Sequence, residues 1–407
     1  MKNTLNLQPD NVFYFFEELS KIPHGSGNTK AISDYCVEFA KKHQLEYHQD
    51  DLNNVIIIKE ATKGFEQAEP IIIQGHLDMV CEKDEDCTID FTKDGLDLFI
   101  DGDFLKARGT TLGGDDAIAI AFSLALLEDD QLKHPRLEMI FTVDEETGMY
   151  GVQGIDLSPI KGNIMLNIDS DEEGVFLTSC AGGLGIQSDL PMTRQMQTGT
   201  HLQLKLTGLF GGHSGGEIHK ERGNSNVLMG RVLKYLSDEF EFSISTLEGG
   251  SKDNAITRMT ISDVLVATQD KDEFLARLAE IKSILQNEYQ TADPDLTIEI
   301  EDKGEATISV LHPTSFSKVL FYLRQAPYGV AHMSVDFPNL VETSDNIGVM
   351  KLEETNFHLH FSIRSSVSTR KYELADKIQF LGEFLGATIT VGSDYPAWEY
   401  KAESKVR

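Results

Sequence analysis

The stretch "PIIIQGHLDMV" (residues 70–80) is an apolar run that ends in a histidine and an aspartate two positions apart. Its β-branched residues predict a buried strand covered on both faces. His76 and Asp78 therefore lie at the carboxyl end of that strand. Two interpretations are open at this point. Either the polar pair marks where a core strand meets solvent, or the strand directs a ligand and its partner toward a site.

The segments around this strand alternate between strand and helix patterns. "NVIIIK" (54–59) is another short β-branched run, and "DDAIAIAFSLALLEDD" (115–130) is apolar nearly all round, as in a buried helix. "LEMIFTVDEETG" (137–148) and "NIMLNIDSDEEG" (163–174) predict strands that finish in acidic residues. This alternation predicts an α/β layer with a mostly parallel sheet.

The pattern changes near Gly182. Later strands alternate apolar and polar residues, as in "THLQLKLTG" (200–208) and "NFHLHFSIRSS" (356–366), which is typical of strands with one covered face. Amphipathic helices are predicted between such strands at 224–239, 270–290, 315–325 and 371–386. We therefore expect a second domain, of sheet-plus-helices type, over residues 187–390.

The composition excludes several classes of partner. A chain of 407 residues is long enough for two domains, and its net charge of −30 argues against nucleic acid or an anionic membrane as a partner. No apolar stretch is long enough to span a bilayer, and no signal-peptide pattern follows the N-terminal lysine. Four cysteines without a C-x-x-C pair indicate reduced thiols, as in a cytoplasm.

Residues of the metal-ligand type gather at four strand or turn ends. These are His76 with Asp78, Asp115 with Asp116, Asp144 to Glu146, and Asp169 with Asp171. Taken singly, each has an ordinary structural explanation, such as a helix cap or a solvated turn. Together they lie where the carboxyl ends of parallel strands form a ligand-binding crevice. Carboxylates so concentrated repel one another unless a cation neutralises them, and imidazole with carboxylate suits zinc or a similar divalent ion.

Longer motifs make the chain similar to a known family. The segments "QGHLDMVCEKD", "ARGTTLGGDD", "FTVDEETGMYGVQG", "NIDSDEEG" with "SCAGG", and "LFGGHSGGEIHKERGN" resemble the M20 zinc peptidases, and within them the aminoacyl-histidine dipeptidase branch. The resemblance implies a mostly parallel-sheet catalytic domain with an inserted α+β lid and dimerisation domain. It assigns 1–186 to the catalytic domain, 187–390 to the lid, and 391–407 to the start of a returning, truncated catalytic segment.

The same resemblance implies a centre of two metal ions. His76 and Asp169 would hold the first ion, Glu146 would hold the second, and Asp115 would bridge both. Zinc is the implied ion, and manganese or cobalt accept similar ligands. The family tends to hold the bond after its bridging aspartate in cis, and this chain has Asp116 where members often have asparagine.

Catalytic and substrate-binding roles follow from the resemblance as well. The carboxylate of Asp78 would orient the imidazole of His76 by accepting its second N–H. Glu145 would be the general base that takes a proton from a metal-activated water. His213 would stabilise the oxyanion of the transition state.

Three further lid residues match positions that handle the substrate. Asn254 and Arg258, in "KDNAITR", and Arg364, in "FSIRSS", would bind the substrate backbone and its free carboxylate. Without the resemblance, each has the ordinary interpretation of a loop or surface-strand residue.

The resemblance implies a cytoplasmic, homodimeric, metal-dependent dipeptidase that cleaves unblocked dipeptides, including Xaa-His dipeptides. The family's last histidine ligand of the second metal has no match before Arg407, so we expect a weakened second site and impaired activity. One alternative is another M20 activity, such as that of a tripeptidase, deacylase or carboxypeptidase. Another is a non-catalytic truncated homologue that binds metal and dimerises.

Overall fold

The computed structural model describes residues 3–170 and 172–405, so Asp171 lies outside the described residues. The chain divides into two compact units. The first comprises the chain up to Phe176 together with Lys405, and the second comprises Leu177–Ser404. Each unit is described by itself below.

The first unit is built on a sheet with the strand order β1–β2–β6–β3–β7. Its strands are β1 (Glu46–Gln49), β2 (Val55–Lys59), β3 (Ile71–His76), β6 (Leu137–Thr142) and β7 (Ile164–Asn167). β3 pairs in parallel with β6 and with β7, whereas β2 runs antiparallel to β1 and β6. Among the described strands of this sheet, β1, β3, β6 and β7 therefore run in the same direction, and β2 runs in the opposite one. The predicted α/β layer with a mostly parallel sheet is confirmed.

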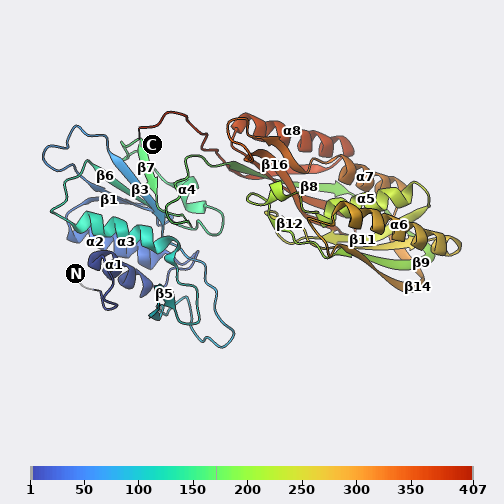
Figure 1. Cartoon of the computed structure of the whole chain (residues 1–407), viewed down its shortest axis with the longest axis horizontal. Coiled ribbons are helices and arrows are strands. Elements are labelled where there is room, and N and C mark those ends of the chain that lie inside the picture. Colours follow the sequence, from blue (N-terminus) through green and yellow to red (C-terminus); the bar gives the residue numbers. More distant parts are fainter. Residues whose placement is uncertain (1–2, 171, 406–407) are drawn as a thin grey trace. The chain divides into compact units, whose positions relative to one another are not determined.

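Helices cover this sheet and enclose β3. The helices of the unit are α1 (Asp10–Ser20), α2 (Lys30–Lys42), α3 (Gly114–Glu128) and the short α4 (Tyr150–Gly154), and a separate hairpin consists of β4 (Leu98–Asp101) and β5 (Phe104–Ala107). Helices α1, α2 and α3 pack on one face of the sheet (Figure 1). Ile73 of β3 joins the core on that face, and Ile72 joins a smaller apolar cluster on the other. The strand that ends at His76 is thus held from both sides.

The second unit contains a larger sheet, ordered β14–β9–β13–β11–β16–β17–β8–β18, with β15 paired to β16. Its strands are β8 (Gly182–Pro191), β9 (Arg194–Thr207), β11 (Phe242–Gly249), β13 (Thr260–Val266), β14 (Thr297–Leu311), β15 (Gly329–Met333), β16 (Val341–Leu352), β17 (Asn356–Ser365) and β18 (Thr388–Tyr395). Buried residues alternate with partly buried ones along β17, as predicted for a strand with one covered face.

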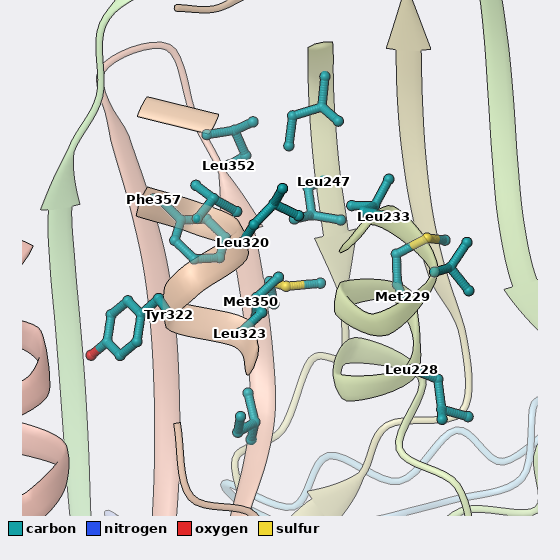
Figure 2. Packing of buried hydrophobic residues seen from close by; sticks show 14 of the residues in the cluster. Leu228, Met229, Leu233, Leu247, Leu320, Tyr322, Leu323, Met350, Leu352 and Phe357 are labelled. Carbon is teal, nitrogen blue, oxygen red and sulfur yellow. The ribbon is translucent and has the colours of Figure 1, made fainter. Parts of the chain in front are cut away.

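Amphipathic helices cover one face of the larger sheet (Figure 1). They are α5 (Ser225–Ser237), α6 (Lys271–Glu288), α7 (Pro313–Gln325) and α8 (Ser368–Leu385), and the short elements are β10 (Gly212–His213), η1 (Ile218–Lys220), β12 (Ala255–Ile256) and η2 (Thr268–Asp270). Figure 2 shows Leu233 of α5 and Leu320 of α7 packed near Leu247, Met350 and Phe357 of the strands. No helix in the described ranges is long and apolar enough to cross a membrane.

The core of the second unit also encloses a carboxyl group, that of Asp345 on β16. Its side chain is almost completely buried, and neither carboxylate oxygen has a hydrogen-bond partner of normal geometry within the described part of the chain. Burial raises the pKa of Asp345 well above its ordinary value, and the backbone N–H of Asn346 offsets only part of that rise. Burial therefore favours the protonated form of this carboxyl in the folded protein.

Asp345→Asn is expected to stabilise the protein at pH 8 relative to the wild type and to lose this advantage toward pH 4. The unfolded chain releases the proton above the ordinary pKa of 3.8, whereas the folded chain keeps it, so wild-type stability falls as the pH rises. The loss is about 1.4 kcal/mol per pH unit until the buried carboxyl ionises. Thermal unfolding of the wild type and of Asp345→Asn between pH 4 and pH 8 measures this loss of stability.

The exposed Asp336 provides the matched control. Asp336→Asn makes the same chemical change at the surface and should leave the pH dependence of the thermal midpoint as in the wild type. If Asp345→Asn also had the same pH dependence of the thermal midpoint as the wild type, the carboxyl of Asp345 would not be protonated in the folded state.

Candidate active site

His76 lies at the end of β3 and is buried. Its Nε2 is 2.7 Å from Oδ1 of Asp115, and its Nδ1 is 2.9 Å from the backbone carbonyl oxygen of Asp78. Burial lowers the pKa of His76, but hydrogen bonds and charges from Asp78, Asp116 and Asp115 outweigh it and raise the pKa to about 10. The imidazole thus sits in a strongly negative environment, of the kind that a cation would neutralise.

The glycine-rich turn before α3 brings two aspartates to His76. Gly113 adopts a left-handed backbone conformation with φ of 66°, and the Asp115–Asp116 peptide bond is cis, as the resemblance implied. Oδ2 of Asp116 accepts a hydrogen bond from the backbone N–H of His76 at 3.2 Å. Gly75 permits this approach, because an added Cβ there would lie 2.6 Å from Oδ2 of Asp116.

The two aspartates of the turn differ in environment. The side chain of Asp115 is 57 % exposed, whereas Asp116 is buried and its Oδ1 has no hydrogen-bond partner in the described part of the chain. Burial, reinforced by the charges of Asp169 and Asp115, raises the pKa of Asp116 to about 7, although His76 opposes the shift. An orphaned carboxylate oxygen beside His76 fits a site built for a positive ion.

The carboxylate of Asp78 connects three segments. It accepts hydrogen bonds from Oγ of Ser26 at 2.7 Å, from the backbone N–H of Glu145 at 3.1 Å and from that of Glu146 at 3.4 Å. Its Oδ1 lies 3.4 Å from Nδ1 of His76, farther than the Asp78 carbonyl oxygen. The side chain expected to orient the histidine therefore also holds the turn that carries the two glutamates.

Glu145 and Glu146 follow β6 in a tight turn. Asp144 has a left-handed φ of 55°, and its Oδ1 accepts a hydrogen bond from the backbone N–H of Gly27 at 2.7 Å. Burial raises the pKa of both glutamates, and the charge of Asp115 adds to the rise in each. Carboxyls with raised pKa values beside a histidine are characteristic of functional sites.

The four predicted metal ligands, together with Asp116, form two groups of ligand-type side chains that share His76. The first group contains His76, Asp116 and Asp169, and the second contains His76, Asp115 and Glu146; within each group the ligand atoms lie within 4.8 Å of one another. Asp169, which follows β7, places Oδ2 4.0 Å from Nε2 of His76. Imidazole and carboxylate oxygens in this arrangement fit a small divalent cation. The region is a candidate metal-binding site.

His213 belongs to the second unit, where β10 pairs with β12. Its Nδ1 accepts hydrogen bonds from the backbone N–H groups of Gly215 at 3.3 Å and Gly216 at 3.1 Å. An accepting Nδ1 in a neutral imidazole leaves the proton on Nε2. Burial, and then the charge of Arg364, lowers the pKa of His213, which favours that neutral form. Nε2 is thus a hydrogen-bond donor near neutral pH.

The other three residues expected to bind the substrate lie around the His213 loop. The carbonyl oxygen of Asn254 accepts a hydrogen bond from the backbone N–H of Ser214 at 2.9 Å. Nε of Arg258 donates to the carbonyl oxygen of Leu209 at 3.2 Å, and this arginine lines a cavity of about 670 Å³ in the second unit. Arg364 approaches the loop at Gly215, where an added Cβ would lie 3.0 Å from its Nε.

Sequence reasoning missed two residues around these sites. Ser26 contacts Asp78, and Tyr395 contacts Arg364. Asp116 was predicted only as a member of the acidic turn, without a role of its own, and it contacts the backbone of His76. The polar turn "HGSGN" and the unusual segment "YPAW" are the signals that could have marked Ser26 and Tyr395.

Comparison with known proteins agrees with this geometry. Residues 204–293 match the M20 family model described as a peptidase dimerisation domain. The whole chain aligns with the cytosol non-specific dipeptidase of Escherichia coli K12, at 34 % identity over 408 residues, covering 84 % of that protein. The chain belongs to the M20 peptidase family.

One solved structure and one further sequence relative extend the comparison for this M20 peptidase. The crystal structure of aminoacylhistidine dipeptidase from Vibrio alginolyticus matches with a TM-score of 0.88 and 34 % identity, covering all of this chain and 83 % of that one. An uncharacterized protein of Bacillus subtilis is 26 % identical over 146 residues, which cover 35 % of this chain and 36 % of that protein. The mixed α/β architecture is thus that of an M20 peptidase.

Proposed function

We propose that this M20 peptidase is a metal-dependent dipeptidase that hydrolyses unblocked dipeptides, including Xaa-His dipeptides. The observation that carries the proposal is the sharing of His76 by two groups of ligand-type side chains, with Glu145 on the adjoining turn. Support also comes from the two relatives of 34 % identity, whose names describe dipeptidases.

Four residues would hold the metal centre. His76 and Asp169 are the proposed ligands of one ion, Glu146 of the other, and Asp115 of both. Among the groups of ligand-type side chains, Asp115 falls with His76 and Glu146, whereas Asp116 falls with His76 and Asp169 and could contribute a further oxygen. Zinc suits these donors, and manganese or cobalt accept the same set. A bound divalent ion supplies positive charge that polarises a peptide carbonyl and makes water more acidic.

Glu145 acts as the general base in this proposal. Its carboxylate removes a proton from the attacking water and delivers it to the amine that leaves. Burial raises the pKa of Glu145, which strengthens the group as a base. Asp78 positions it by accepting a hydrogen bond from its backbone N–H.

The second unit supplies the groups that bind the substrate. His213 donates from Nε2 to the oxyanion that develops on the scissile carbonyl. Asn254 and Arg258 contact the substrate backbone, and Arg364 binds its terminal carboxylate through the planar guanidinium. We further propose that this unit is the lid and forms a homodimer, in line with the match to a dimerisation domain, and that the enzyme works in the cytoplasm.

Release of histidine from Gly-His or β-Ala-His tests this function. Metal-free protein supplied with Zn²⁺, Mn²⁺ or Co²⁺ should release histidine from both substrates, and not from N-acetyl-Gly-His, whose amino group is blocked. Hydrolysis of N-acyl amino acids without hydrolysis of free dipeptides would indicate a different M20 activity. A lack of turnover with every ion would indicate a protein that binds metal without catalysis.

A further inference from the structure

We propose that Tyr395 is a positioning residue, which fixes the guanidinium of Arg364 for the terminal carboxylate of the substrate. The inference rests on the proposed function, because it takes the carboxylate of an unblocked dipeptide as the group that Arg364 binds. Tyr395 lies at the end of β18, in the segment "YPAW".

The contact between the two side chains is direct. Nη1 of Arg364 donates a hydrogen bond to Oη of Tyr395 at 3.0 Å. Nε of Arg364 is buried and has no hydrogen-bond partner within the described part of the chain. A guanidinium is planar and carries its donors in a fixed fork, so one anchored nitrogen sets the direction of the others. The hydroxyl of Tyr395 therefore selects the orientation in which Arg364 meets a carboxylate.

Tyr395 is itself held in place by the sheet beneath it. Its ring lies against Gly183 of β8, where an added Cβ would collide with the ring. The backbone carbonyl of Tyr395 accepts a hydrogen bond from Nζ of Lys371 at 2.7 Å, and that lysine is completely buried. Hydrogen bonds join the backbones of Cys180 and Trp398 in both directions, at 2.9 and 3.0 Å. The hydroxyl thus projects from a segment fixed on both sides.

Arg364 also lies beside the His213 loop. At Gly215, an added Cβ would be 3.0 Å from Nε of Arg364 and 3.0 Å from Cε1 of His213. The proposed carboxylate-binding group and the proposed oxyanion donor therefore share one small cluster. A change that lets Arg364 move should weaken the binding of the substrate carboxylate first, since Tyr395 contacts Arg364 and His213 is held by its own loop.

Tyr395→Phe removes the hydroxyl and keeps the ring on Gly183. Loss of one hydrogen bond to a charged group should raise KM for Gly-His about tenfold, with kcat within about twofold of the wild type. With Gly-His amide, which has no carboxylate, the variant and the wild type should have the same KM. In an Arg364→Ala background the same change should have no further effect, because its partner is gone.

Tyr372→Phe is the matched control. Tyr372 lies on α8, and its hydroxyl donates a hydrogen bond at 2.9 Å to Asp394, the neighbour of Tyr395 on β18. Among the described residues, Arg364 donates to the hydroxyl of Tyr395 and not to that of Tyr372. This variant should keep the wild-type KM for both substrates. A similar rise of KM in both tyrosine variants would overturn the proposal, as would a fall of kcat at constant KM in Tyr395→Phe.

A binding measurement separates this proposal from the proposed function. Calorimetry can compare the binding of free histidine with that of histidinamide, which lacks the carboxylate, and it needs no turnover. The wild type should bind histidine about tenfold more tightly than histidinamide. Tyr395→Phe should reduce that preference to about twofold. If the wild type released no histidine from Gly-His, the proposed function would fail, and this ratio would still decide the role of Tyr395. An unchanged ratio, or no preference in the wild type, would overturn it.

Discussion

His76→Ala is expected to abolish metal binding and to reduce dipeptide hydrolysis by a factor of about a thousand or more. His76 belongs to both groups of ligand-type side chains, so its removal opens both at once. A lost metal centre withdraws several kcal/mol of transition-state stabilisation, which corresponds to roughly three powers of ten in rate. Metal content after dialysis and the release of histidine from Gly-His are the measurements.

Two further variants test whether a loss of metal in His76→Ala results from misfolding. His48→Ala removes an exposed histidine that contacts Glu46, and it should retain both metal and activity. Asp115→Ala changes a side chain that is 57 % exposed, so it should lose metal without disturbing the core. Wild-type metal content in His76→Ala would contradict the assignment of His76 as a ligand.

Glu145→Gln is expected to lower kcat by about a thousandfold, within the range that general acid–base catalysis contributes. Glutamine has nearly the same shape but cannot take up the proton of water, and the hydrogen bond from the backbone of residue 145 to Asp78 does not involve the side chain. KM and metal content should therefore stay near their wild-type values. Steady-state kinetics on Gly-His and metal analysis test both parts.

Glu173→Gln is the control for this substitution, because Glu173 is exposed. It should have wild-type kinetics. A kcat for Glu145→Gln within tenfold of the wild type would mean that another group accepts the proton. Loss of metal in that variant would instead make Glu145 a ligand.

The sequence was most informative where local pattern and burial coincide. The β-branched run of β3 and the apolar helix α3 predicted a layered α/β unit, and both elements lie where the pattern indicated. Residues at the carboxyl ends of parallel strands meet at one edge of the sheet. This rule predicted that His76, Asp115 and Glu146 would lie close together, as they do in the structure.

The remaining contacts depend on segments far apart in the chain. Ser26 donates to Asp78 across 52 positions, and Arg364 reaches Tyr395 through the pairing of β17, β8 and β18. Strand register of this kind is set by tertiary packing, so no local pattern reveals it. The buried carboxyl of Asp345 is also invisible in the sequence, where a polar residue in a strand predicts exposure.

The hydrogen bonds of Asp78 couple two properties that enzymologists usually vary separately. The carboxylate of Asp78 lies beside His76, the proposed metal ligand, and also accepts hydrogen bonds from the backbone N–H groups of Glu145 and Glu146. A substitution of Asp78 should therefore disturb the proposed ligand and the proposed base together, and metal affinity and kcat are expected to change in parallel. A change at Asp115, whose side chain is 57 % exposed and makes no hydrogen bond with that backbone within the described part of the chain, should by contrast alter the proposed metal affinity without moving the turn that carries Glu145.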